Sequence, residues 1–280
     1  MTRATLAQVL QPALAGGYAV AGLVCLGWED ARAYVAAAEA ERAPLILQAG
    51  PAARAHTPLP ILAAMLRHLA ETASVPVVTH LDHGTSLEEC RMAIGEGFSS
   101  VMFDGSRLPL SQNIAETAAV AELAHAAGIG CEGEVGFVGY QDGQQSVGTY
   151  PDQAARFARE TLVDAMAVSV GNLHLQRQAG PAPLDRVRLD AIAALTRVPL
   201  VIHGGSGVAM AERQALAAHT TICKINIGTE LRQSFGAALR ASLAADPDLF
   251  DRIALLKSTE TPVTLATRAA LRSLLSHNRA

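Results

Sequence analysis

The sequence alternates eight times between a short apolar run and a longer amphipathic stretch. The short runs are rich in valine and isoleucine, which is typical of strands buried on both faces of a parallel sheet. They span residues 18–26, 44–50, 75–82, 99–105, 128–136, 164–172, 198–205 and 221–228. The helical stretches cover residues 29–42, 58–73, 86–97, 111–127, 151–162, 185–197, 208–218 and 229–244.

This alternation predicts a (β/α)8 barrel, the TIM-barrel architecture. Parallel strands joined through helices form right-handed βαβ units, and eight such units close into a barrel. The alternative is an open doubly wound sheet, but no G-x-G-x-x-G turn follows the first apolar run. The length of 280 residues fits one such barrel. We therefore predict a single domain over residues 1–280, with additional C-terminal helices at about 245–280.

Charge, hydropathy and cysteine usage exclude several classes of partner. The formal net charge is −4 without a basic patch, which argues against nucleic acid. No run approaches the roughly 20 apolar residues that span a bilayer, and the N-terminal stretch lacks the apolar core of a signal peptide. The four cysteines are far apart and form no C-x-x-C pair. We expect a soluble cytoplasmic protein that binds neither nucleic acid nor membranes.

Three histidines follow apolar runs, at the strand ends where barrel enzymes carry their chemistry. His83 follows the third run, His174 the sixth and His203 the seventh. A single histidine at such a place is most simply a solvent-exposed residue without a functional role, but three of them match the ligand composition of a catalytic zinc site. Glu134 at the end of the fifth run is a fourth candidate ligand, and Asp104 follows the fourth run.

Glycine-rich turns after the last two runs suggest a phosphate site. The stretches HGGSG (203–207) and NIGT (226–229) place backbone N–H groups near the start of a helix, and barrel loops at these positions often hold phosphate. The alternative is a tight turn that needs glycine for its backbone conformation. The candidate substrate- and phosphate-binding residues are Gly171, Gly204, Gly205, Ser206, Asn226, Gly228 and Thr229.

Six motifs in order give the chain a resemblance to a known family. They are LDHG (81–84), FDGS (103–106), EGEVG (132–136), GNLH (171–174), VIHGGSG (201–207) and KINIGTE (224–230). Together they resemble the metal-dependent class II fructose-bisphosphate and tagatose-bisphosphate aldolases. The resemblance extends from about residue 16 to residue 247, although each motif alone is weakly specific.

The resemblance implies reversible cleavage of a ketose phosphate into dihydroxyacetone phosphate and an aldehyde, through a metal-stabilised enediolate. It makes Asp82 the catalytic carboxylate and His80 a structural neighbour. The implied cofactor is Zn²⁺ at the histidines, Glu134 and Asp104, with room for a second divalent ion or a monovalent cation. On a strand, Asp82 and His83 would face opposite ways, so that one reaches the substrate while the other holds the metal. We expect a homodimer or homotetramer that packs through residues beyond 245.

Four positions depart from the family pattern. Leu175 stands where the family has a glycine after the sixth-strand histidine, and Asp142 is the nearest counterpart of a loop glutamate that shuttles the carbon-bound proton. Gly50 and Asp248 stand where a serine and an arginine meet the second phosphate in the bacterial enzymes. We therefore expect an aldehyde half that carries no phosphate.

Three alternatives stay open at this point. A Schiff-base mechanism would need a buried lysine at a strand end, for which Lys224 is the candidate, but it would leave the three histidines without a role. The substrate could instead be another ketose or a keto acid. A non-catalytic homologue that binds sugar phosphate is disfavoured, because both the candidate base and the metal ligands are present.

Overall fold

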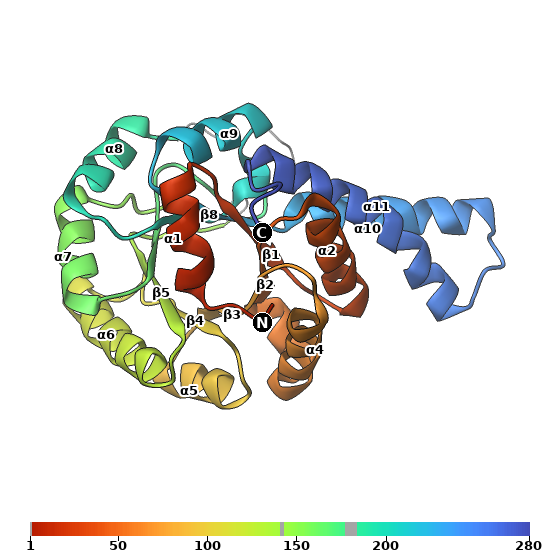
Figure 1. The fold of residues 1–280 in the computed structure, drawn as a ribbon, viewed down its shortest axis with the longest axis horizontal. Coiled ribbons are helices and arrows are strands. Elements are labelled where there is room, and N and C mark those ends of the chain that lie inside the picture. Colours follow the sequence, from red (N-terminus) through yellow and green to blue (C-terminus); the bar gives the residue numbers. More distant parts are fainter. Residues whose placement is uncertain (1, 141–142, 177–183) are drawn as a thin grey trace.

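The computed structural model describes residues 2–140, 143–176 and 184–280, and its core is a closed parallel barrel (Figure 1). Within the described residues the strands follow one another in chain order, and the last pairs with the first. They are β1 (Val20–Val24), β2 (Leu45–Ala49), β3 (Val77–Gly84), β4 (Ser100–Phe103), β5 (Gly130–Val135), β6 (Ala165–Val168), β7 (Leu200–Ile202) and β8 (Ile222–Ile227). The predicted fold class is confirmed.

Helices surround this barrel, and each predicted helical stretch forms one. They are α2 (Trp28–Glu41), α4 (Leu59–Thr72), α5 (Leu87–Gly95), α6 (Leu110–Ala126), α7 (Pro151–Thr161), α8 (Arg186–Leu195), α9 (Met210–His219) and α10 (Thr229–Ala245). The extension past residue 245 forms α11 (Arg252–Ser273). No helix of the described segments is long and apolar enough to cross a bilayer.

Helix α1 (Leu6–Gly16), which the periodicity did not predict, lies across the barrel in Figure 1. A capping box between Thr5 and Gln8 fixes its start. Its buried face packs on side chains near the beginnings of the strands, among them Val20 and Val78. This apolar layer closes the barrel at the end opposite the strands' carboxyl termini.

Above that apolar layer the barrel interior is polar. Lys224 of β8 and Glu132 of β5 form an ion pair with 2.5 Å between Nζ and Oε2, and both side chains are fully buried. His80 Nδ1 lies 2.8 Å from Ser100 Oγ in the same layer. Gly22 of β1 faces these groups, and a Cβ there would come within 2.5 Å of Asn226 Oδ1. The missing side chain thus makes room for polar groups beneath the strand ends.

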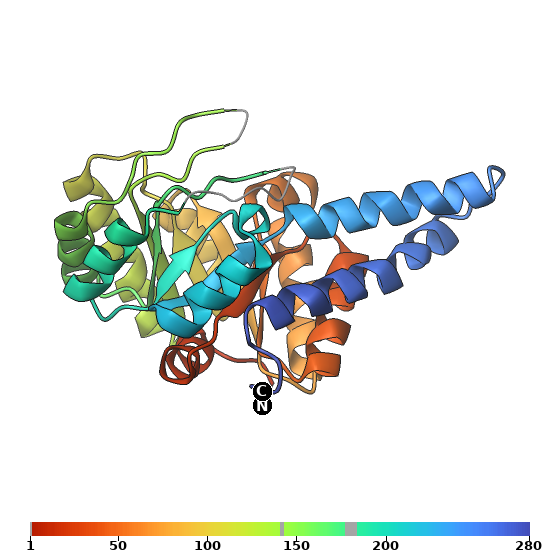
Figure 2. The same ribbon diagram turned by 90° about the horizontal axis from the view of Figure 1, so that it is seen from above.

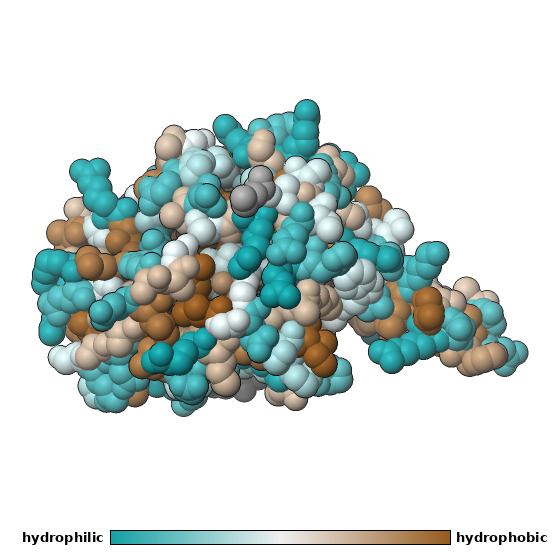
Figure 3. All heavy atoms as spheres, turned by 60° about the horizontal axis from the view of Figure 1, so that its bottom comes forward, coloured by the Kyte–Doolittle hydropathy of each residue, from teal (hydrophilic) through white to brown (hydrophobic). Residues whose placement is uncertain are grey.

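Helices α10 and α11 form an antiparallel arm that projects from the barrel (Figure 2). The base of the arm is fixed to α2, because Glu41 accepts hydrogen bonds from Arg268 Nε (2.6 Å) and Arg272 Nε (2.8 Å). At the far turn, Phe250 is 93% exposed and Ile253 is 76% exposed. Figure 3 shows the arm as a projection with mixed apolar and polar side chains.

Candidate active site

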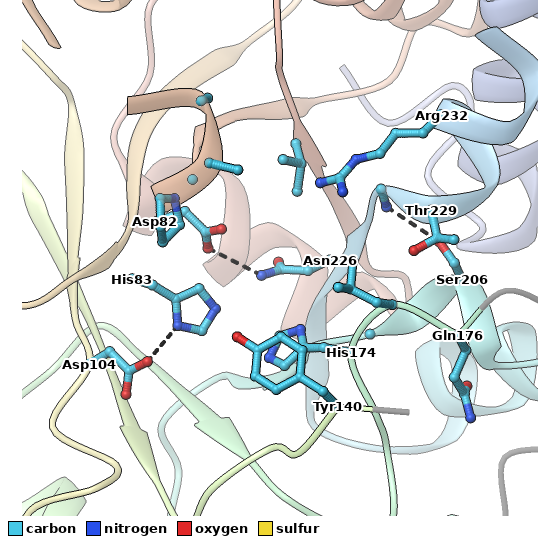
Figure 4. A pocket seen from close by; sticks show the side chains of 18 of the residues that line it. Asp82, His83, Asp104, Tyr140, His174, Gln176, Ser206, Asn226, Thr229 and Arg232 are labelled. Carbon is cyan, nitrogen blue, oxygen red and sulfur yellow. Dashed lines mark hydrogen bonds and ion pairs between the residues drawn. The ribbon is translucent and has the colours of Figure 1, made fainter. Parts of the chain in front are cut away.

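A cavity of about 480 Å³ opens at the carboxyl ends of the strands (Figure 4). Its walls come from segments that follow seven of the strands, so they are brought together only when the barrel closes. The lining residues include Gly50, Asp82, His83, Asp104, Arg107, Tyr140, His174, Ser206, Asn226, Thr229 and Arg232. This is the end at which barrel enzymes carry their active sites.

The three predicted histidines meet beside this cavity. One ring nitrogen from each of His83, His174 and His203 lies within 4.8 Å of the others. The ring centroids of His83 and His203 are 4.8 Å apart, and those of His83 and His174 are 5.4 Å apart. His83, Asp104 and Glu134 form a second group whose ligand atoms lie equally close. The structure therefore brings all five predicted ligands together.

A local irregularity in β3 turns His83 toward the cavity. The pairing of β3 with β4 shifts register between Leu81 and Gly84, and His83 has a φ of 53°, in the left-handed region. Both Asp82 and His83 therefore line the cavity, and the expectation that they face opposite ways is wrong. Arg54 of α3 (Pro51–His56) supports this backbone, because its guanidinium donates to the carbonyls of Asp82 (2.7 Å) and His83 (3.0 Å).

Two buried atoms of the histidine cluster lack hydrogen-bond partners. His203 Nδ1 and Glu134 Oε2 are 3.4 Å apart, and neither makes a hydrogen bond. The other ring nitrogen of His203, Nε2, lies 3.1 Å from Glu132 Oε1. Buried polar atoms are normally satisfied, and a carboxylate that orients the far side of a histidine is common around metal ions. The donor set therefore fits a divalent cation with nitrogen and oxygen ligands.

The charges in the cluster alter its protonation strongly. Burial would lower the pKa of His83, but Asp82, Asp104 and Glu134 outweigh it and raise the pKa to about 10. Burial and the neighbouring histidines lower the pKa of His174 to about 3. Burial and Asp104 raise the pKa of Glu134 to about 7. The carboxylates thus favour a positive charge at this point, which either a proton or a metal ion can supply.

Asp82 is held as a buried carboxylate at the tip of β3. Its Oδ1 accepts hydrogen bonds from Gln48 Nε2 (2.7 Å) and Asn226 Nδ2 (3.5 Å). Burial would raise its pKa, but His83 and Lys224 outweigh that effect and lower it. A Cβ at Gly50 would lie 3.4 Å from Asp82 Oδ2, so this glycine leaves space beside the second oxygen. Asp82 is therefore an ionised carboxylate that faces the cavity.

The predicted phosphate residues lie mostly on one wall. Gly204, Ser206, Asn226, Gly228 and Thr229 line the cavity, whereas Gly171 and Gly205 do not. Ser206 Oγ accepts hydrogen bonds from the backbone N–H groups of Gly228 and Glu230, both at 3.3 Å. This ties the turn after β7 to the start of α10.

The backbone of this wall has two residues in the left-handed region. Gly204 has a φ of 69°, and a Cβ there would lie 2.0 Å from the carbonyl oxygen of Leu173, so only glycine fits. Leu175 has a φ of 57° and is half exposed on the cavity wall. A leucine therefore occupies a backbone conformation that glycine adopts with less strain.

Several predicted or suspected residues lie elsewhere. Asp142 lies outside the described residues. Asp248 is exposed in the turn at the far end of the arm and does not line the cavity, so its repulsion cannot act on a substrate bound in the same chain. Lys224 is buried below the cavity in its pair with Glu132 rather than at the surface of the site.

Five residues at the site were not found from the sequence. They are Gln48, Arg54, Arg107, Tyr140 and Arg232. Arg232 lies one turn into α10, and its Nε is buried without a hydrogen-bond partner. None of these residues belongs to a motif in the sequence, and they come together at the cavity only in the closed barrel.

Comparison with known proteins points to one family. The chain matches the family model described as fructose-bisphosphate aldolase class-II over residues 4–279. It is 36% identical to the fructose-bisphosphate aldolase of Geobacillus stearothermophilus, over 90% of this chain and 89% of that protein. It is also 36% identical to a 6-phospho-5-dehydro-2-deoxy-D-gluconate aldolase of Shouchella clausii strain KSM-K16, over 98% of this chain and 95% of that one. Its structure resembles the YdjI aldolase of Escherichia coli K12, with a TM-score of 0.88, 29% identity and 99% of each chain covered.

Proposed function

Because the chain belongs to the class II fructose-bisphosphate aldolase family, we propose that it cleaves a ketose phosphate reversibly to dihydroxyacetone phosphate and an aldehyde. The family makes it a carbon–carbon lyase of generally metal-dependent type that acts on sugar phosphates. The observation that carries the specific reaction is the meeting of three histidine nitrogens within 4.8 Å beside the buried carboxylate of Asp82.

We propose that His83, His174 and His203 hold a zinc ion. Glu134 would serve as a fourth ligand. Asp104 would orient the imidazole of His83, because Asp104 Oδ2 lies 2.6 Å from His83 Nδ1. The unpartnered His203 Nδ1 and Glu134 Oε2 support this assignment. A bound divalent ion would supply the Lewis acidity that stabilises the enediolate of dihydroxyacetone phosphate.

Asp82 would remove the proton from the hydroxyl group that becomes the aldehyde carbonyl. Its ionised state and its place on the cavity wall support this role. Gln48 and Asn226 bind Oδ1, and they orient the carboxylate so that Oδ2 is directed toward the space at Gly50. We propose that Asp142 moves the carbon-bound proton, as the loop acid of the family does.

The phosphate of dihydroxyacetone phosphate would bind at the wall formed by Gly204, Ser206, Gly228 and Thr229. The N-terminus of the long helix α10 lies there, and Arg232 adds a full positive charge one turn later. We include Gly171, Gly205 and Asn226 in this proposal, although Gly171 and Gly205 do not line the cavity. A monovalent or second divalent cation would share the carboxylates of Asp104 and Glu134 with the zinc site, because these two residues and His83 form a second group of possible ligands.

We propose that the aldehyde half carries no phosphate, and Gly50 is the ground for this. A glycine offers no hydroxyl donor to a second phosphate at this wall. The repulsion expected from Asp248 no longer supports the proposal, because that residue lies at the end of the arm.

A second candidate is an aldolase of a phosphorylated keto acid. It is favoured by the relative from Shouchella clausii, whose name describes a deoxygluconate phosphate substrate. The two cations Arg107 and Arg232 on the cavity wall suit a substrate with a second anionic group.

We propose that residues 1–280 form one barrel domain and that this domain assembles into a homodimer or homotetramer. The apolar side chains of Phe250 and Ile253, exposed on the arm, support the assembly. The four cysteines are buried free thiols, as is usual in proteins of reducing compartments, which supports a cytoplasmic location.

The test is release of dihydroxyacetone phosphate from a panel of ketose phosphates and phosphorylated keto acids. It is run on the zinc-loaded protein, the chelated protein and a His174→Ala variant. We expect cleavage by the loaded protein alone, with recovery when zinc is returned to the chelated wild type. Full activity in the metal-stripped protein would contradict the zinc assignment, and no release from any substrate would contradict the reaction.

A further inference from the structure

Tyr140 packs on the histidine cluster, and its segment is hydrogen-bonded to the backbone of His174, one of the candidate metal ligands. The segment after β5 is paired with itself, since Phe137 and Val147 exchange backbone hydrogen bonds of 2.8 and 2.9 Å. Tyr140 N donates to the carbonyl of Gln144 at 3.1 Å, and His174 N donates to the carbonyl of Gly139 at 2.8 Å. The position of Tyr140 is therefore fixed relative to His174.

The phenol ring packs on the imidazole of His174. Their centroids are 5.0 Å apart with an interplanar angle of 30°. Figure 4 shows the Tyr140 ring over His174, with its hydroxyl directed into the cavity toward His83. The side chain is 39% exposed and lines the same cavity as Asp82 and His83. The hydroxyl thus faces the space where the reacting carbons of a substrate would lie.

The groups around the Tyr140 hydroxyl include few hydrogen-bond donors for a substrate. Asp82 and Asp104 accept hydrogen bonds, and the three histidines would bind the proposed metal ion. A tyrosine hydroxyl donates one hydrogen bond and is protonated at neutral pH. In the cleavage direction, negative charge moves onto oxygen atoms of the dihydroxyacetone phosphate half, and a fixed donor there stabilises the transition state.

We propose that Tyr140 is a further catalytic residue, whose phenol donates a hydrogen bond to the substrate oxygen on which this charge develops. The proton stays on the phenol throughout, so the residue changes no bond and needs no co-reactant. The motifs that carry the family resemblance do not include Tyr140. The inference rests on the proposed aldolase function and adds to it a residue of this chain.

A Tyr140→Phe variant removes the hydroxyl and keeps the ring over His174. We expect kcat for cleavage to fall by about 10²-fold, as when one preorganised donor is removed, with KM changed by less than about threefold. Zinc affinity, measured by competition with a chelator, should equal that of the wild type, because no proposed ligand is altered. Tyr150→Phe is the matched control, since Tyr150 is 57% exposed outside the cavity and its variant should match the wild type.

A Tyr140→Leu variant separates the hydroxyl from the ring, and its kcat should fall at least as far as that of Tyr140→Phe. A Tyr140→Phe enzyme with kcat within about twofold of the wild type would overturn the inference. So would an unchanged kcat with the whole loss in KM, or a loss of zinc that accounts for the loss of rate. If the wild type itself releases no dihydroxyacetone phosphate, the proposed function fails and the inference fails with it.

Discussion

The buried ion pair between Lys224 and Glu132 should be a main determinant of stability below the site. Both side chains are 0% exposed, and Nζ and Oε2 are 2.5 Å apart. Burial would raise the pKa of Glu132, but Lys224 and the hydrogen bond to His203 outweigh it and hold the pKa well below its usual range. A Lys224→Met substitution keeps much of the side-chain volume but leaves this carboxylate without its cation.

The expected loss is about 3–5 kcal/mol in the free energy of unfolding, the usual cost of removing one partner of a buried ion pair. Without Lys224, the remaining partners of the Glu132 carboxylate are His203 Nε2, 3.1 Å from Oε1, and His80 Nε2, 3.7 Å from Oε2. An imidazole stabilises a buried carboxylate less than an ammonium group does, so the loss should be large. A double variant, Lys224→Met with Glu132→Gln, removes both charges and should recover at least half of the loss.

Urea unfolding of the metal-free protein near pH 7.5 measures these differences, provided that the m-values of the variants agree. Arg156→Met on α7 is a control, because Arg156 forms an exposed i,i+4 pair with Glu160 and its variant should unfold at the same urea concentration as the wild type. A loss below about 1 kcal/mol for Lys224→Met would refute the reasoning, since exposed pairs show losses of that size.

Three further predictions concern the reaction and its pH dependence. Asp82→Asn should lower the cleavage rate by about 10²–10⁴-fold while dihydroxyacetone phosphate still exchanges its carbon-bound proton; a cleavage rate close to that of the wild type would identify another base. Glyceraldehyde should be condensed with dihydroxyacetone phosphate at a higher kcat/KM than glyceraldehyde 3-phosphate, because Gly50 offers no donor to a second phosphate. A preference of about tenfold or more for the phosphorylated aldehyde would contradict this expectation. Burial and Lys224 lower the pKa of His80 to about 3. Below pH 6.5 the unfolded chain therefore takes up a proton at this residue that the folded chain does not. The free energy of unfolding should fall from pH 6.5 to pH 5, with His80 contributing up to about 1.4 kcal/mol per pH unit. A His80→Gln variant should show a shallower decrease in urea titrations, and an unchanged slope would contradict this assignment.

The fold was predictable because alternation along the chain is a local property. The apolar runs and helical stretches identified each strand and each surrounding helix to within a few residues. Two α-helices were missed for identifiable reasons: α1 carries Pro12 in its interior, and α3 has only six residues. The run at 164–172 extends beyond β6 (Ala165–Val168), because Val170 and Asn172 are buried without belonging to the strand.

The site was only partly predictable, because its remaining features depend on the closed barrel. No residue pattern signals the register shift that turns His83 into the cavity. Lys224 and Glu132 are 92 positions apart and meet only across the barrel interior. Arg54 and Gln48 act on Asp82 and its backbone from the neighbouring strand and helix, a contact that requires the actual register of β2 on β3.

Exchange of a carbon-bound proton of dihydroxyacetone phosphate with solvent tests the proposed chemistry most directly, since it needs no knowledge of the aldehyde. Dihydroxyacetone phosphate alone is incubated with the protein in D2O and followed by proton NMR, before chelation, after chelation and after zinc is returned. We predict incorporation of a single deuterium at the carbon that forms the new bond, its loss on chelation and its recovery with zinc. No exchange by the zinc-loaded protein, or equal exchange by the stripped protein, would contradict a metal-dependent aldolase at the histidine cluster.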